Sequence, residues 1–160
     1  MDTVQKEFKF EMCHRLLGRD PYTKKIVEYC DNCKNLHGHS YKATIVMRRT
    51  NDNGFGGQTR LDEFGMIYDY NKMKKMKKWI DDNLDHCAMI SKYDKDLLKF
   101  VKSQKGKDKH FVIDSPTTAE NICILLFGIA SELLNDGTGK VCAVKVKETE
   151  SSEAVYEPED

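Results

Sequence analysis

The stretch HGHSYKATIVM, from His37 to Met47, decides the fold because it carries two patterns in one extended segment. From Tyr41 to Met47, apolar side chains fall at every second position, which is the alternation of a half-buried β-strand. Side chains two residues apart in a strand point to the same face, about 6.6 Å apart along it. His37 and His39 would therefore face one ion together, at the start of this strand.

The same alternation locates further strands. Residues 5–13 alternate around Phe8 and Phe10, which predicts a strand that could pair with the one above. Near the end of the chain, the segment KVCAVKVKET and the shorter segment EAVYE flank a Ser-Ser turn, as in a hairpin. We expect strands at 5–13, 41–47, 140–149 and 153–157, with irregular chain at 16–36 and a glycine-rich loop at 51–59.

Helical spacing separates the two groups of strands. Apolar residues at 73–84 recur three and four positions apart, with lysines on the other side. A second pattern at 122–133 follows Thr117-x-x-Glu120, which matches a capping box and assigns Glu120 to the start of that helix. A short helix is expected within 91–110, followed by an exposed lysine-rich loop. The order β-β-α-(α)-α-β-β predicts an α+β fold of antiparallel hairpins around helices, in one domain over 1–160.

Composition excludes several classes of protein. The chain has 160 residues, with 26 basic and 26 acidic side chains, so its formal charge is zero and no surface for nucleic acid or membrane is predicted. The chain shows no signal-peptide pattern and no apolar run near the ~20 residues of a membrane span. Its six cysteines are expected to be reduced thiols of a cytoplasmic protein.

Three of the five histidines suggest a metal site. His14 ends the predicted strand at 5–13, and an antiparallel neighbour would bring it beside His37 and His39. Three histidines with one open position are typical of catalytic zinc, whereas a structural site is closed by a fourth protein ligand. The alternative is a set of surface histidines that bind no metal.

Cys30 and Cys33 form a C-x-x-C pair that has several interpretations. A redox pair normally opens a helix, and here a strand follows. A zinc finger places its second pair of ligands more than ten residues away, whereas His37 follows closely. A thiol near a dication can instead be held as thiolate and act as a general base.

Two further places carry ionisable residues. Asp85 precedes His86 and could orient its imidazole for proton transfer, although such a dipeptide is also common at a helix end. Glu148 falls on the apolar face of its strand together with Cys142, whereas Lys145 and Lys147 occupy the other face. Such a carboxylate forms an internal salt bridge, lies at an exposed strand end, or binds the N–C–NH2 edge of a ligand through two parallel hydrogen bonds.

Together these segments resemble the family of 6-pyruvoyltetrahydropterin and 6-carboxytetrahydropterin synthases along the whole chain. The segments that carry the resemblance are, in chain order, FEMCHRL, CKNLHGHSY, GMIYDYNKMK, LDH, TTAENI and VKVKETESSEAVY. The resemblance implies a tunnelling fold (T-fold), a barrel-forming homo-oligomer (trimer or hexamer) and active sites between subunits. It also implies that His14, His37 and His39 bind Zn²⁺, that Cys33 is the general base, that Asp85 and His86 relay protons, that Glu148 anchors the pterin ring, and that Thr118 lines its pocket.

The implied substrate is 7,8-dihydroneopterin triphosphate. Cys33 stands four residues before His37, as in the bacterial 6-carboxytetrahydropterin synthases of queuosine biosynthesis; in the animal pyruvoyl enzymes the thiol stands six before, where this chain has Asp31. This spacing favours a lyase that yields 6-carboxytetrahydropterin, acetaldehyde and triphosphate. The alternatives are a 6-pyruvoyltetrahydropterin synthase, which releases triphosphate only, and a non-catalytic module stabilised by zinc.

Overall fold

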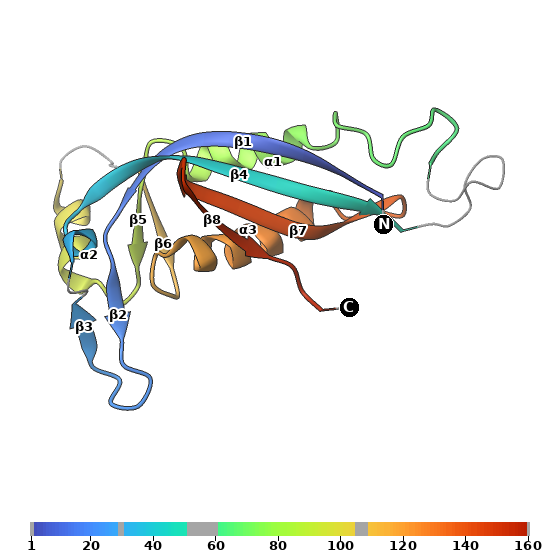
Figure 1. Cartoon of the computed structure of the whole chain (residues 1–160). Helices are drawn as coiled ribbons and strands as arrows, with labels where there is room; N and C mark the ends of the chain where they lie inside the picture. The colour runs from blue at the N-terminus through green and yellow to red at the C-terminus, as the bar shows by residue number, and fades with distance from the viewer. Residues whose placement is uncertain (1, 29–30, 51–60, 105–108, 160) are drawn as a thin grey trace.

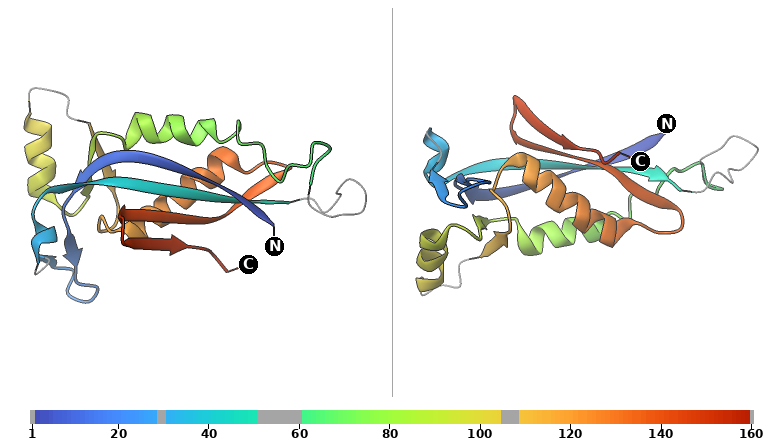
Figure 2. Two further views of the ribbon diagram at one scale, coloured as in Figure 1. Left: turned by 45° about the horizontal axis from the view of Figure 1, so that its top comes forward. Right: turned by 90° about the horizontal axis from the view of Figure 1, so that it is seen from below.

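The computed structural model describes residues 2–28, 31–50, 61–104 and 109–159. In this part of the chain, six strands form one curled sheet in the order β6-β5-β1-β4-β7-β8, and α1 and α3 cover one of its faces (Figures 1 and 2). The α+β class is therefore confirmed. The glycine-rich segment 51–59, Cys30 and part of the predicted lysine-rich loop lie outside the described residues.

Strands β1 (Thr3–His14) and β4 (His37–Arg49) form the long antiparallel ribbon at the centre of the sheet. The predicted alternation is confirmed, because Phe8 and Phe10 of β1 and Tyr41, Ala43 and Ile45 of β4 are all buried on the helix-covered face. The register pairs the last residue of β1 with the first of β4. The strand pairing that creates the core therefore also places the end of β1 beside the start of β4.

The hairpin of β7 (Gly139–Thr149) and β8 (Ser152–Tyr156) extends the sheet on the other side of β4. Its register with β4 shifts between Val46 and Met47, and Cys142 has no partner in β4 there, as in a β-bulge. Val141 therefore joins Val144 in the core, and Cys142 is only half-buried. Placing Cys142 on the apolar face was wrong, because the extra residue shifts the alternation before it.

Strands β5 (Cys87–Ser91) and β6 (His110–Ile113) were not predicted. β5 pairs in parallel with β1, and β6 pairs in parallel with β5 through a crossover that contains α2 (Lys95–Ser103). The prediction of antiparallel hairpins without any parallel unit was therefore wrong at this edge. Ile90, Leu97 and Val101 form a small second core between β5 and α2.

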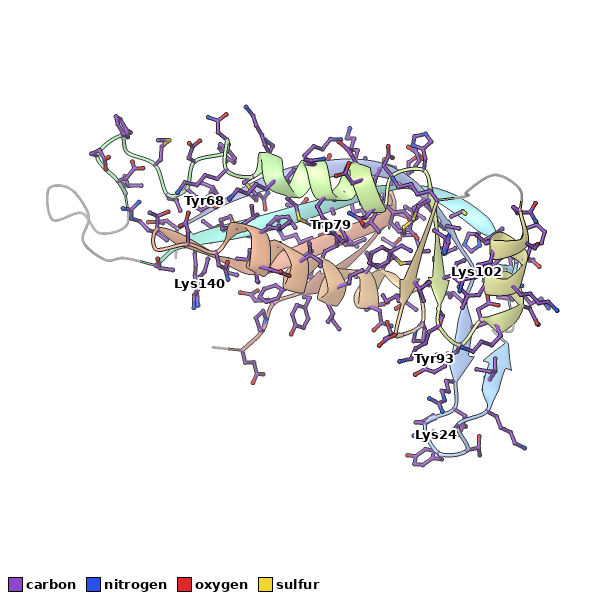
Figure 3. The ribbon with its side chains drawn as sticks, turned by 180° about the vertical axis from the view of Figure 1, so that it is seen from behind. Lys24, Tyr68, Trp79, Tyr93, Lys102 and Lys140 are labelled. Atoms are coloured by element: carbon purple, nitrogen blue, oxygen red, sulfur yellow. The ribbon has the colours of Figure 1, made fainter. Side chains whose placement is uncertain are left out.

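Residues 16–36 are more regular than predicted. β2 (Leu17–Arg19) and β3 (Ile26–Glu28) pair as an antiparallel arm that projects from the sheet, with Lys24 near its tip (Figures 1 and 3). A 3-10 turn, η1 (Asn32–Lys34), follows and is capped by the Asp31 side chain. The arm was not predicted because strands of three residues are too short to show an alternation of apolar and polar side chains.

Helices α1 (Lys74–Asn83) and α3 (Ala119–Leu134) pack against the sheet as expected. The cap of α3 is Thr118, whose side-chain oxygen accepts a hydrogen bond from Asn121 N, so the predicted cap at Thr117 was wrong by one residue. Glu120 makes no capping bond to any described residue. Thr117 is fully buried, and its hydroxyl donates to Arg15 O. None of the described helices is both long and apolar enough to cross a membrane.

A partly buried ion pair connects the start of α2 to Arg15, the residue that follows β1. Asp94 accepts two hydrogen bonds of 2.6 Å from Arg15 and also caps α2 by accepting from Leu97 N. We expect Asp94→Ala to lower the free energy of unfolding by about 3 kcal/mol, because it removes the carboxylate that accepts two hydrogen bonds from the partly buried Arg15 guanidinium and also removes a helix cap. Lys78→Ala, which breaks the exposed Lys78–Asp82 pair, should leave the midpoint of thermal unfolding unchanged. Equal midpoints for the two variants would contradict the role of this ion pair.

Candidate functional site

Three histidines converge where β1 ends and β4 begins. His14 and His37 are register partners, and His39 lies two residues further along the same face of β4. Their ring centroids are 4.7 Å (His14–His37), 4.9 Å (His37–His39) and 5.4 Å (His14–His39) apart. One nitrogen from each ring lies within 4.8 Å of the other two. The predicted cluster is therefore present, and its histidines are positioned to hold a metal ion.

Backbone carbonyls fix two of the imidazole tautomers. His14 Nδ1 lies 2.7 Å from Thr117 O, and His37 Nδ1 lies 2.7 Å from Asn35 O. A carbonyl oxygen can only accept, so both Nδ1 atoms carry the proton and both Nε2 atoms are left for a metal. The pKa of His39 is lowered, chiefly by burial, which favours its neutral form. These are the protonation states that metal ligation requires.

Glu148 contacts this histidine cluster. Its Oε1 lies 3.0 Å from His14 Nε2 and 3.7 Å from His39 Nε2, and it accepts a hydrogen bond of 2.9 Å from the Tyr41 hydroxyl. The proximity of His14 is the main cause that lowers the pKa of Glu148 to about 2, and the hydrogen bond from Tyr41 adds to it. The carboxylate is therefore ionised and lies on the inward face, as its strand position predicted.

Tyr41 is a site residue that the sequence analysis assigned only to the core. It follows His37 and His39 on the same face of β4, and its hydroxyl lies 3.2 Å from His14 Nε2. A tyrosine hydroxyl on a buried strand face needs a polar partner. That requirement, applied to the residue two positions after His39, is the signal that could have identified it.

A cavity of about 410 Å³ brings three of the predicted residues together. Cys33, Thr118 and Glu148 line it, with Leu16 and residues 152–154 among the other wall residues. η1 presents the Cys33 side chain, and its backbone is fixed because Leu16 N donates to Cys33 O at 2.7 Å. This volume lies within the range of small-molecule sites. Glu148 joins the cavity to the histidine cluster, because it touches both.

The Asp85–His86 pair lies elsewhere on the chain surface. Asp85 Oδ2 is 2.9 Å from His86 Nδ1, and Asp85 Oδ1 accepts from Glu11 N, which is the main reason that the pKa of Asp85 is lowered. His86 has a φ of 56°, and its side chain is 77% exposed. Within the described residues, no contact joins this pair to the three histidines.

A larger cavity, of about 540 Å³, contains none of the predicted site residues. The Arg15–Asp94 ion pair, Tyr93 and Lys34 are among its lining residues. It lies beside α2, near the labelled Tyr93 (Figure 3). Volume alone therefore does not identify the candidate site, whereas the gathering of histidines, thiol and carboxylate does.

Comparisons with known proteins agree with this geometry. The chain is 29% identical to 6-carboxy-5,6,7,8-tetrahydropterin synthases of Rickettsia typhi, over 91% of the chain and 93% of the relative, and of Aquifex aeolicus, over 98% of both. It is 27% identical to a putative 6-pyruvoyl tetrahydrobiopterin synthase of Caenorhabditis elegans, over 78% of the chain and 73% of the relative.

Solved structures confirm the T-fold. An uncharacterised protein of Wolinella succinogenes superposes with a TM-score of 0.74 at 23% identity, over 99% of this chain and 98% of that one. The 6-pyruvoyl tetrahydropterin synthase of Caenorhabditis elegans superposes with a TM-score of 0.64 at 23% identity, over 99% and 96%. The model of one enzyme family matches residues 3–159 of this chain. The chain belongs to the 6-pyruvoyl tetrahydropterin synthase family, which is the family that its sequence motifs resemble.

Proposed function

We propose that the chain is a zinc-dependent lyase that converts 7,8-dihydroneopterin triphosphate and one water molecule to 6-carboxytetrahydropterin, acetaldehyde and triphosphate. The observation that carries the proposal is the contact of Glu148 with both the histidine cluster and the cavity lined by Cys33. A metal site, a thiol and a recognition carboxylate are thereby adjacent in a member of a pterin synthase family.

The Nε2 atoms of His14 and His37, together with His39, would hold the zinc ion. Neutral imidazoles suit zinc, and three of them leave a coordination position open for substrate. When bound, zinc supplies a Lewis acid that lowers the pKa of a substrate hydroxyl. Thr117 O and Asn35 O orient the rings and raise their basicity as ligands.

Glu148 would bind the pterin ring. The pterin carries an N–C–NH2 edge that can donate two parallel hydrogen bonds to a carboxylate, and Glu148 is ionised and lies at the cavity wall. Thr118 would contribute to the same wall. Its hydroxyl already accepts from Asn121 N, so it serves the pocket through its position at the start of α3.

Cys33 would remove a proton from the substrate, and the Asp85–His86 pair would deliver a proton to another position on the substrate. The pair does not touch the histidine cluster within one chain, and the His86 side chain is exposed. We therefore propose that a homo-oligomer, a trimer or a hexamer, completes the site by bringing this pair of one protomer to the histidines of its partner. The left-handed backbone of His86 fits this role, because such strain recurs at functional sites.

The carboxy product is favoured over the pyruvoyl product by two observations. Cys33 stands four residues before His37, and relatives that align with most of the chain carry the carboxy name. The relative in Caenorhabditis elegans carries the pyruvoyl name, so the pyruvoyl product is the alternative. The first product would place the chain in the queuosine pathway.

Product analysis tests the proposal. The zinc-loaded protein would be incubated with 7,8-dihydroneopterin triphosphate, and the products would be identified by mass spectrometry. A carboxypterin formed together with acetaldehyde is expected. A pyruvoylpterin without acetaldehyde would assign the chain to the alternative, and no turnover of a protein that contains zinc would contradict both.

A further inference from the structure

Among the described residues, the Glu148 carboxylate makes its polar contacts through one oxygen. Oε1 accepts from the Tyr41 hydroxyl at 2.9 Å and lies 3.0 Å from His14 Nε2 and 3.7 Å from His39 Nε2. No described residue donates a hydrogen bond to Oε2. A carboxylate can rotate about its bond to the side chain, so the orientation that leaves Oε2 available must be held by the groups around Oε1.

The Tyr41 hydroxyl is the donor best placed to hold it. The Tyr41 side chain is fully buried, and its ring stacks on Phe10 with a centroid separation of 5.4 Å and an interplanar angle of 8°. The rings of His14 and His39 meet it edge-on, at 5.9 Å and 5.6 Å. Because the ring is packed on several sides, the hydroxyl is fixed in place and cannot follow Glu148 if the carboxylate moves.

The position of Glu148 allows two competing roles. A carboxylate oxygen close to two imidazole nitrogens is a potential fourth protein ligand, and a fourth ligand would close the metal site. A carboxylate that binds an N–C–NH2 edge must instead present both oxygens to the cavity in one plane. Each oxygen has two acceptor sites, so Oε1 can accept from Tyr41 and still take part in binding a ligand.

We propose that Tyr41 is a positioning residue that holds Glu148 in the orientation for pterin recognition. The inference rests on the proposed function, because it names the residue that makes the recognition carboxylate effective. Tyr41 acts through Glu148 and does not itself touch the ligand. Its loss should therefore weaken pterin binding only while a carboxylate is present at position 148.

A double-mutant cycle tests this coupling. Binding of 7,8-dihydroneopterin, which lacks the triphosphate leaving group, would be measured by calorimetry on the zinc-loaded protein. We expect Tyr41→Phe to raise Kd about tenfold, which is about 1.4 kcal/mol, and Glu148→Gln to raise it at least as much. The double variant should bind no more weakly than Glu148→Gln alone. Zinc content should remain that of the wild type in each variant.

Tyr68→Phe is the matched control. Tyr68 is a second buried tyrosine, and its hydroxyl donates to Leu134 O at 2.7 Å. In Figure 3, Tyr68 lies far from Tyr93 and from the end of the molecule that contains α2. This variant also loses one buried hydroxyl contact, but Kd should not change. If Tyr41→Phe behaved like Tyr68→Phe, or if the two effects at 41 and 148 simply added, the inference would be wrong.

A second variant covers the case in which Tyr41→Phe does not fold. Glu148→Asp keeps the negative charge but withdraws the carboxylate from the Tyr41 hydroxyl, so it should raise Kd about as much as Tyr41→Phe. An unchanged Kd for Glu148→Asp would overturn the inference. A wild-type protein that binds zinc but no pterin would overturn the proposed function, and this inference with it.

Discussion

Removal of zinc is expected to reduce turnover of 7,8-dihydroneopterin triphosphate to background while the fold persists. The three histidines lie at one end of the sheet, and the core between the sheet and α1 and α3 is built from apolar side chains. Two of the histidines also have protein partners of their own, Thr117 O and Asn35 O. The fold therefore does not depend on a metal–ligand bond. The measurements are turnover and far-UV circular dichroism before and after chelation, followed by the return of zinc.

A pair of histidine variants separates ligation from general damage. His37→Ala should lose zinc and turnover, whereas His110→Ala should keep both, because His110 is an exposed residue of β6 outside the cluster. Chelation that unfolds the chain would instead indicate a structural zinc site. It would favour the non-catalytic module over the lyase.

The residues of the histidine cluster were predictable because local periodicity determines their geometry. Alternation along β4 places His37 and His39 on one face, and only one strand pairing was needed to bring in His14. The same alternation predicted the inward position of Glu148. It could not predict that Oε1 meets His14, because that contact joins residues far apart in the sequence through the packing of β1, β4 and β7.

The strands that were not predicted show no regular alternation of apolar and polar residues in the sequence. β5 has five residues, nearly all buried, and β6 has four, of which the last three are apolar although Val112 is exposed, so neither sequence alternates between apolar and polar residues. The bulge at Cys142 changes which face of the sheet the neighbouring side chains point to, and no glycine or proline at the bulge marks this change in the sequence. For Asp85 and His86, adjacency in sequence made a contact between the two side chains possible, and that contact is present, but their position relative to the three histidines depends on tertiary structure and assembly.

Replacement of Cys33 by alanine is expected to lower the rate of turnover by roughly 10²–10⁴-fold, the usual contribution of a general base. Zinc should be retained, because the proposed ligands are the three histidines. The wall of the cavity should also be retained, since Leu16 N donates to the backbone carbonyl of Cys33 and not to its thiol. Rate, zinc content and Kd for 7,8-dihydroneopterin would be measured on the same preparation.

Cys142→Ala is the matched control for this change. Cys142 is another half-buried thiol, but it lies at the bulge of β7 and outside the cavity that contains Cys33. We expect its loss to leave the rate unchanged. Loss of zinc from Cys33→Ala would make Cys33 a metal ligand, and full activity of Cys33→Ala would assign the base to another residue. A slow variant that still binds zinc and pterin is the combination that only a base beside the metal predicts, because a ligand would change zinc content and a wall residue would change Kd.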